Sequence, residues 1–435
     1  MRATAKCYDN LRAYIEEIPL IDCHDHTGQA GPKYNDAIEF LVVHYMAADL
    51  ISASSERDFR YMTDRAVPME RRWPVFEKAW KRTCHTGYAQ TLKRALQRFY
   101  NVEQLTPETL QTLQNNLLNL EDETLFERIL DEAKIRVRLE DLCGIDTAGM
   151  KQILDGSFKL SPKGRLVITL PRFHAIRSYE TVYELTSVVD KTVTSLEEYL
   201  TVCREIFEGC KRFGAVAFKD QSAYTRILRY DNPTRSQAEA VFNWFMQDPR
   251  RQAGYPDQVK PLDDYLFHEF MRMARDMDLP VQVHTGHMAR NYDDITKTNA
   301  VHMTAIFELH RDVRFDLFHA NWPYSGELLF LAKNYPNVSM DFCWANIIDP
   351  VYCQNLFKQA LSCVPHGKIH GFGADFGGSA ELAWAHAAIA RDNIAIALAE
   401  MVDMDYLSLD DAKEVAFCWL FSNANAYYRL NISSP

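Results

Sequence analysis

The sequence predicts an α/β fold, a (β/α)8 TIM barrel with a large helical insertion after its first strand. Short apolar runs rich in β-branched and aromatic residues recur along the chain, and amphipathic segments of helical period lie between them. Eight such runs can be counted. Strands that alternate with helices pair in parallel through crossovers, and a chain of 435 residues is long enough to close eight of them into a barrel with insertions.

Each predicted strand ends in polar residues and is followed by a predicted helix. Ser195 and Glu198 form a capping box ahead of the helix that precedes the fourth strand. The predicted strands are residues 18–24, 135–141, 165–171, 215–220, 280–286, 314–320, 337–342 and 369–375. Further predicted helices cover residues 261–277, 299–312, 325–335 and 349–361.

Two connections are much longer than a barrel requires. Residues 30–130 carry several amphipathic segments, and we expect them to form a helical insertion that covers the barrel mouth or builds a subunit interface. Residues 221–260 are rich in turn signals and form a second predicted insertion. The whole chain, 1–435, is expected to be one barrel domain that contains both.

Composition excludes several classes of protein. With 48 basic and 59 acidic residues the net charge is −11, which disfavours a general nucleic-acid binder. No run approaches 18 apolar residues, and acidic residues stand where a signal peptide needs its apolar segment. The ten cysteines include no CxxC pair, which argues against zinc-finger and thioredoxin-like folds. We expect a cytoplasmic protein without membrane contact.

Side chains of the metal-ligand type stand at the ends of four predicted strands. The first strand ends in His24-Asp25-His26, and residues two apart in an extended chain point to the same face, so both imidazoles project together. The other strand-end candidates are His284 after strand five, His319 after strand six and Asp375 after strand eight. Each alone is an ordinary capped polar residue.

Together these residues predict a metal centre, because the carboxyl ends of parallel barrel strands share one rim. Imidazole and carboxylate ligands with open positions describe a catalytic zinc, manganese or iron site. Lys219, at the end of strand four, is costly to bury unless it is paired or modified. It is expected to form an ion pair, to bind an anionic substrate, or to be carboxylated and bridge two metals.

Candidate substrate-binding residues lie on loops expected at the barrel mouth. Arg226 and Arg172 follow strands four and three, and either could bind a carboxylate through a bidentate fork. Tyr224, Trp322 and Trp344 lie near strand ends and could line the pocket, although packing of the rim is the alternative for each.

The order of these residues resembles the amidohydrolase superfamily of metal-dependent hydrolases. The segments FKDQSAYTRIL, HTGH, HANWPY and GFGADF are more narrowly similar to the amidohydrolase-2 branch and to FluG-type domains. The resemblance implies that His24, His26 and His284 are metal ligands. It also implies that FCWLFSNANAYYRL is the final helix, which closes the barrel bottom.

The same resemblance implies the roles of the remaining site residues. Asp375 would contact the metal and act as general base, and His319 would be a second-metal ligand or polarise the scissile carbonyl. Lys219 matches a position that some members carboxylate, so one-metal and two-metal centres both stay open. The metal is expected to be one or two divalent ions, zinc first, with manganese or iron as alternatives.

These expectations predict a metal-dependent hydrolase in which a metal-activated water cleaves a C–N bond (amide, including the γ-glutamyl type) or a C–O bond (lactone) of a small carboxylate-bearing substrate. A decarboxylase or a uronate-isomerase-like enzyme on the same barrel is the alternative. The large insertion favours the isomerase group, but Asp375-Phe376-Gly377 lacks the arginine that those isomerases carry two residues after the aspartate. A binding protein without catalysis is the third reading, and a homo-oligomer is expected in each case.

Overall fold

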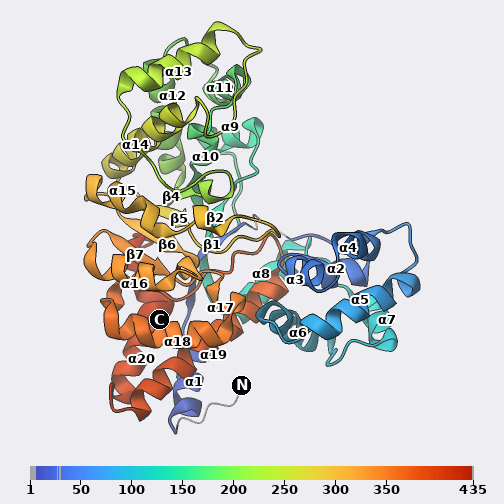
Figure 1. Ribbon diagram of the computed structural model, residues 1–435. Coiled ribbons are helices and arrows are strands. Elements are labelled where there is room, and N and C mark those ends of the chain that lie inside the picture. The colour runs from blue at the N-terminus through green and yellow to red at the C-terminus, as the bar shows by residue number, and fades with distance from the viewer. Residues whose placement is uncertain (1–5, 27, 29–30, 434–435) are drawn as a thin grey trace.

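The computed structural model describes residues 6–26, 28 and 31–433, and its centre is one sheet of eight strands (Figure 1). The strands follow one another around the sheet in chain order, and every neighbouring pair is parallel. The predicted α/β barrel is therefore confirmed. The strands are β1 (Leu20–Asp25), β2 (Ile135–Asp141), β3 (Gly164–Thr169), β4 (Ala217–Asp220), β5 (Val281–His284), β6 (Phe315–Phe318), β7 (Val338–Asp341) and β8 (Ile369–His370).

The seam between β8 and β1 is closed by the residues that follow β8. Backbone N–H groups of Cys23 and Asp375 donate to the carbonyl oxygens of Phe372 (3.1 Å) and His24 (2.9 Å). β8 has only two residues, whereas a strand was predicted over 369–375, because the chain leaves β7 after His370 and turns towards β1. The barrel is consequently nearly closed, with single backbone hydrogen bonds in place of strand pairing between β8 and β1.

Helices fill the connections between the strands. Ser195 caps α12 by accepting from the backbone N–H of Glu198 (3.2 Å), but the Glu198 carboxylate binds the backbone of Thr194, one residue before the position that a capping box needs. The principal helices after β2 are α9 (Thr147–Asp155), α12 (Leu196–Phe213), α14 (Lys260–Met277), α15 (Thr304–Leu309), α16 (Ser325–Asn334), α18 (Pro350–Cys363) and α19 (Ala380–Asp403). Shorter elements are α1 (Tyr8–Glu17), α10 (Pro171–His174), α11 (Tyr179–Thr186), η1 (Ser187–Val189), η3 (Ile295–Lys297), η4 (Ala300–Met303), η5 (His319–Asn321), α17 (Ala345–Ile348) and η6 (His366–Lys368).

Seven helices between β1 and β2 form the predicted insertion, and α2 to α7 project sideways from the barrel as a lobe (Figure 1). Its inner helices pack on α19, where Tyr100 donates to the buried carboxylate of Glu381 (3.2 Å) and Phe99 meets Trp384 edge to face. The insertion is thus fixed to the barrel. Its helices are α2 (Ala37–Val42), α3 (Met46–Ala53), α4 (Glu56–Thr63), α5 (Met69–Thr83), α6 (Gly87–Tyr100), α7 (Pro107–Asn116) and α8 (Glu123–Glu132). Residue 30, the first of the predicted insertion, lies outside the described residues.

The segment between β4 and α14 holds η2 (Ser222–Tyr224) and α13 (Arg235–Gln247), and α13 packs on α14. At the opposite end of the chain, α20 (Leu409–Phe417), η7 (Cys418–Ser422) and α21 (Asn423–Tyr427) follow α19. The Tyr428 hydroxyl there donates to Asp316 and accepts from the Gln282 amide (3.1 Å), so the terminal segment contacts the barrel interior from below, as the resemblance implied.

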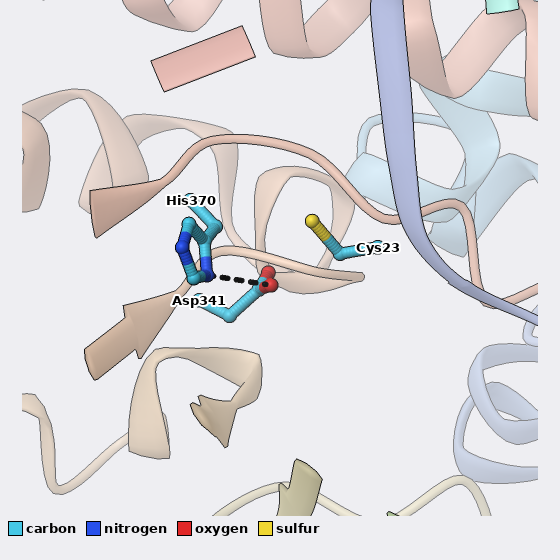
Figure 2. Close-up of side chains that lie close together, drawn as sticks. All are labelled: Cys23, Asp341 and His370. Carbon is cyan, nitrogen blue, oxygen red and sulfur yellow. Dashed lines mark ion pairs between the residues drawn. The ribbon is translucent and has the colours of Figure 1, made fainter. Parts of the chain in front are cut away.

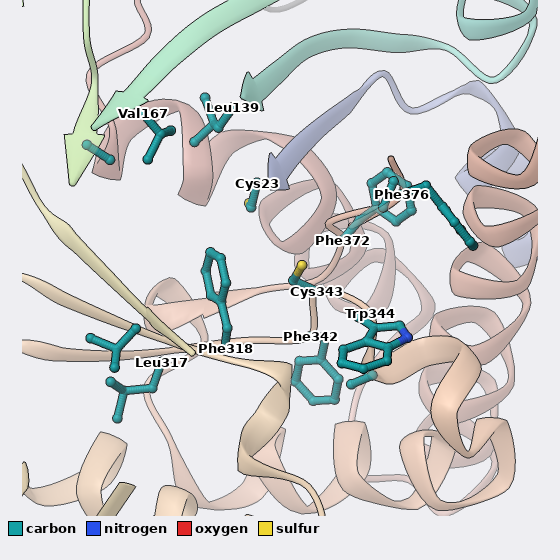
Figure 3. Packing of buried hydrophobic residues seen from close by; sticks show 14 of the residues in the cluster. Cys23, Leu139, Val167, Leu317, Phe318, Phe342, Cys343, Trp344, Phe372 and Phe376 are labelled. Carbon is teal, nitrogen blue, oxygen red and sulfur yellow. The ribbon is translucent and has the colours of Figure 1, made fainter. Parts of the chain in front are cut away.

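The barrel interior is densely packed with apolar side chains (Figure 3). Phe318, Phe342, Trp344 and Phe372 have no exposed surface, and each such burial contributes about 2–3 kcal/mol to folding. Among the described residues, none of the helices combines the length and apolar character that crossing a bilayer would require. This packed core gives the rim a rigid base.

Candidate metal centre

The strand ends bring the predicted ligands to one point, with the Asp375 carboxylate among three imidazoles. Its Oδ1 lies 3.2 Å from His26 Nε2 and 3.7 Å from His24 Nε2, and its Oδ2 lies 3.7 Å from His319 Nε2. His284 joins through its Nδ1, 3.0 Å from the same His319 nitrogen. Residues that are more than 350 positions apart in the sequence therefore share one centre.

Three of these imidazoles are oriented by backbone carbonyl groups. Because a carbonyl oxygen only accepts hydrogen bonds, the ring nitrogen that faces it carries the proton, and the other nitrogen of the neutral ring is free to bind a cation. The free nitrogens of all three rings point to the centre. The pairs are His26 Nδ1 with the Asp141 oxygen (3.0 Å), His284 Nε2 with the His287 oxygen (2.7 Å) and His319 Nδ1 with the Cys343 oxygen (3.0 Å).

Two of the ligands stand in left-handed backbone. His319 has φ of 53° and Asp375 has φ of 55°, a conformation that costs a non-glycine residue about 1–3 kcal/mol. The Asp375 backbone is held by its N–H on the His24 carbonyl (2.9 Å) and by the Tyr45 hydroxyl, which donates to its carbonyl oxygen. This local strain turns both side chains inward where the strands end.

Lys219 lies at the floor of the centre and is 1% exposed. Its Nζ is 3.3 Å from His24 Nε2 and 4.1 Å from the centre of the Phe318 ring. Burial lowers the pKa of Lys219, although the Asp375 charge opposes this change. In the described chain no carboxylate lies within 4 Å of Nζ, so the expected ion pair is not formed and the other two expectations for Lys219 stand.

Burial also keeps most of the imidazoles neutral. It lowers the pKa values of His24, His284 and His319 far below the usual value, and the Lys219 charge adds to the effect for each. His26 differs, because its hydrogen bond to Asp375 outweighs burial and raises its pKa well above the usual value. Neutral imidazole is the form that binds a metal.

The donor set fits a divalent cation of the zinc, manganese or iron class. Ligand bonds of about 2.0–2.1 Å in a tetrahedron place the ligand atoms about 3.3 Å apart. The separations between the facing atoms of His24, His26, His319, His284 and Asp375 run from 3.0 to 3.7 Å. His24 Nδ1 is buried without a hydrogen-bond partner, so nothing in the protein satisfies this ring on its second side.

Two further residues extend the centre. Asp141 groups with His24 and His26, and Cys343 groups with His319 and Asp375, with the ligand atoms of each group within 4.8 Å of one another. One ion and two ions are both compatible with this arrangement. Asp141 ends β2 and Cys343 follows β7, so the strand-end argument applied to those strands would have found both.

A cavity of about 280 Å³ opens above the centre. Tyr224 lines it as predicted, with its ring 4.7 Å from that of His284. The lining residues that sequence reasoning missed are His44, Tyr45, Cys143, Gln221, Ala289 and Gly377. Gln221 directly follows β4 and Cys143 lies two residues after β2, whereas His44 and Tyr45 belong to the insertion and gave no sequence signal.

The insertion supplies an aromatic wall beside the centre. Tyr45 stacks on Trp344 (4.3 Å between ring centres) and on Tyr88 (5.3 Å). Trp344 is buried and meets the His319 ring edge to face at 5.0 Å. Trp322 packs edge-on against His287. Both tryptophans therefore support the wall and do not line the cavity, which is a correction to their predicted role.

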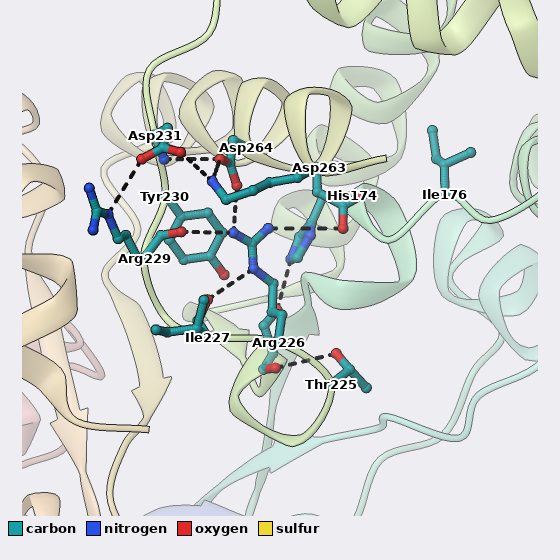
Figure 4. Close-up of polar contacts among 12 residues, drawn as sticks. His174, Ile176, Thr225, Arg226, Ile227, Arg229, Tyr230, Asp231, Asp263 and Asp264 are labelled. Carbon is teal, nitrogen blue, oxygen red and sulfur yellow. Dashed lines mark hydrogen bonds and ion pairs between the residues drawn. The ribbon is translucent and has the colours of Figure 1, made fainter. Parts of the chain in front are cut away.

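Arg226 is not among the residues that line the cavity, and Figure 4 shows the polar contacts that it makes instead. It is 1% exposed, binds the Asp264 carboxylate, donates to two backbone carbonyl groups of its own loop and covers the Tyr230 ring at 4.0 Å. Two adjacent buried carboxylates of α14, Asp263 and Asp264, need a cation, and Arg226 turns towards them. Arg172 donates to the backbone carbonyl of Ile145 and does not line the cavity. The predicted substrate role of both arginines is thus not supported by their positions.

A parallel eight-stranded barrel with imidazole and carboxylate donors at its carboxyl rim has the architecture of metal-dependent hydrolases. The family described as amidohydrolase matches residues 249–430, which include β5 to β8 and the ligands that follow them. Over 98% of its length the chain is 23% identical to the protein FluG of Emericella nidulans, and it spans 47% of the length of that relative. The second half of the chain thus matches the amidohydrolase family, and the whole chain is distantly similar to FluG.

Solved structures share the whole fold. The chain is similar to glucuronate isomerase from Caulobacter crescentus, with a TM-score of 0.77, 18% identity and 98% and 94% of the two chains covered. It is similar to uronate isomerase from Thermotoga maritima, with a TM-score of 0.75, 14% identity and 98% of both chains covered. A candidate metal-dependent hydrolase from Lactobacillus casei matches with a TM-score of 0.65, 18% identity and 97% of both chains covered.

Proposed function

We propose that the protein is a metal-dependent hydrolase that cleaves the C–N bond of an amide, the γ-glutamyl type included, or the C–O bond of a lactone, in a small carboxylate-bearing substrate. The observation that carries this proposal is the Asp375 carboxylate, which lies among His24, His26 and His319 and lines the cavity together with the first two. A carboxylate in this position can bind a cation through one oxygen and accept and donate a proton through the other.

The residues divide the chemistry among them. A divalent cation held by His24, His26 and Asp375 would supply Lewis acidity and lower the pKa of water from about 15.7 towards about 7. Asp375 Oδ2, on the His319 side, takes the proton of the attacking water and returns it to the leaving group. His319, whose unprotonated Nε2 faces the centre, would be a further ligand of a cation, and that cation would stabilise the negative charge that grows on the carbonyl oxygen of the substrate.

The cavity indicates a small substrate. Its volume of about 280 Å³ lies near the lower end of ligand pockets, and Tyr45, Tyr224 and Gln221 give it aromatic and hydrogen-bonding walls. Arg290 replaces Arg226 as the proposed partner of the substrate carboxylate, because its exposed guanidinium lies 5.2 Å from the ring of the cavity residue Tyr224; it pairs with Asp293 (3.4 Å) and would have to exchange that partner for the substrate.

The experiment is a screen of the metal-loaded protein over γ-glutamyl amides, other small amides and lactones, with Asp375→Asn as the comparison. Hydrolysis of one of these classes, lost in Asp375→Asn with most of the metal retained, supports the proposal. Rates in Asp375→Asn near those of the wild type would place the general base elsewhere.

Uronate isomerisation is the second candidate, because the likeness to two uronate isomerases covers 98% of the chain and includes the insertion. Gly377 weighs against it. It lines the cavity at the position where that isomerase group carries an arginine, and a side chain there would have open space, its nearest neighbour being His44 at 3.9 Å. Turnover of uronates, and of none of the amides or lactones, would reject hydrolysis in favour of this candidate.

A further inference from the structure

A second group of metal-ligand side chains lies inside the barrel, within the strands rather than beyond their ends (Figure 2). Cys23 comes from β1, Asp316 from β6, Asp341 from β7 and His370 from β8, and none is more than 1% exposed. The ligand atoms of Cys23, Asp341 and His370 lie within 4.8 Å of one another. No residue of this group belongs to the centre at the rim.

The side chains of this group are close enough to bind one small cation, although His370 and Asp316 form a direct hydrogen bond in its absence. His370 Nδ1 is 2.8 Å from Asp316 Oδ2 and 3.6 Å from Asp341 Oδ2, on either side of the separation of about 3.3 Å expected in a tetrahedral site. Figure 2 shows the Cys23 thiol on the other side of the Asp341 carboxylate from His370, so the carboxylate lies between a nitrogen and a sulfur donor.

This group holds more carboxylates than cationic side chains. Two buried carboxylates face one imidazole, and in the described chain no lysine or arginine nitrogen lies within 4 Å of either carboxylate. Asp341 Oδ2 and Asp316 Oδ1 are both buried without a hydrogen-bond partner. A protonated His370 balances one carboxylate, and burial with the Asp316 charge raises the pKa of the other, Asp341, to about 7, so ionising both carboxylates in this dry interior is costly without a further cation.

We propose that Cys23, Asp316, Asp341 and His370 form a second divalent-cation site that is structural and separate from the catalytic centre. One sulfur, one nitrogen and two oxygen donors make a closed set of four protein ligands, for which zinc is the best match. The ion would join β1 to β6, β7 and β8 across the seam where β8 is only two residues long. It would thereby fix the strands that carry His24 and Asp375.

The test uses a protein in which two of the rim ligands have been replaced, His24→Ala/His26→Ala, so that its outcome is independent of the proposed hydrolase activity. Purified without chelator and shown to be folded by circular dichroism, this variant is expected to retain about one zinc ion per chain. Adding Cys23→Ser is expected to remove that ion. The matched control Cys203→Ser, a buried cysteine of α12, is expected to leave it in place.

Cobalt substitution identifies the sulfur ligand. The thiolate-to-cobalt charge-transfer band in the near ultraviolet should be present in the His24→Ala/His26→Ala background and in the added Cys343→Ser variant, and absent with Cys23→Ser. A folded background variant without zinc overturns the proposal, and so does a band that depends on Cys343 instead of Cys23.

Crystals of the wild-type protein supply a test that needs no variant. Anomalous diffraction at the zinc edge should give a peak among Cys23, Asp341 and His370. A direct His370–Asp316 hydrogen bond with no anomalous peak beside it would show a metal-free ion pair and overturn the proposal.

Discussion

Replacing Arg226 by methionine separates a structural role for this arginine from a role in substrate binding. The guanidinium is 1% exposed and binds Asp264, which is itself 1% exposed. Removing one partner of a buried ion pair costs about 3–5 kcal/mol because the other charge stays buried. Asp264 retains two partners in the variant, the Lys260 ammonium and the Asp231 backbone N–H (2.9 Å). We therefore expect Arg226→Met to lower the free energy of unfolding by about 3 kcal/mol, the lower end of this range.

The assay is equilibrium unfolding in denaturant, followed by circular dichroism, with thermal unfolding beside it. An unfolding entropy of about 2.1 cal/mol/K per residue gives about 0.9 kcal/mol/K for 435 residues, so 3 kcal/mol corresponds to a fall in Tm of about 3 °C. Arg235→Met is the control, because its pairs with Glu197 and Glu239 are exposed to solvent and contribute little to stability.

The folded Arg226→Met enzyme should bind its substrate as the wild type does, because Arg226 does not line the cavity. A variant as stable as the wild type whose KM for carboxylate substrates rises more than about tenfold (about 1.4 kcal/mol) would refute the structural assignment.

Three further predictions follow from the centre and its surroundings. Asp375→Asn should lower kcat at least about a hundredfold while most of the metal stays bound, measured by steady-state kinetics with elemental analysis; rates within threefold of the wild type would contradict it. Tyr45→Phe removes the hydroxyl that donates to the Asp375 carbonyl and should lower kcat about three- to tenfold, whereas Tyr61→Phe, on the exposed side of α4, should not change it. Burial lowers the pKa of His44 from about 6.5 to about 4 in the folded protein. Between these two pH values the unfolded state binds more protons than the folded state, so stability should fall as the pH drops from about 6.5 to about 4. The free energy of unfolding, measured at a series of pH values, should fall less in His44→Gln than in the wild type over this range. An equal fall in both proteins would show that His44 is not its cause.

The fold was predictable because its signals are local. Seven strands lie within about two residues of their predicted bounds, since each is a short apolar run followed by polar residues. The eighth was overestimated because its end is set by pairing with β1 across the seam, a long-range contact. The convergence of the candidate ligands was likewise predictable, because the carboxyl ends of parallel barrel strands share one rim, where His284, His319 and Asp375 lie together.

The rest of the site depends on contacts that no local pattern encodes. Arg226 is turned to Asp264 by a helix that begins 34 residues later, and Tyr45 reaches Asp375 from an insertion whose docking the sequence does not specify. Strict alternation along β1 puts Cys23 on the face opposite His24. The register of β1 is irregular between Asp22 and Asp25, and both side chains reach the barrel interior.

The central claim is that the residues at the strand ends bind a divalent cation, and the metal content of two proteins tests it most directly. Wild type and His24→Ala/His26→Ala, both folded and purified without chelator, are compared by elemental analysis. The geometry predicts that the variant contains at least about one metal equivalent fewer per chain than the wild type. Equal metal content in the two proteins would contradict it.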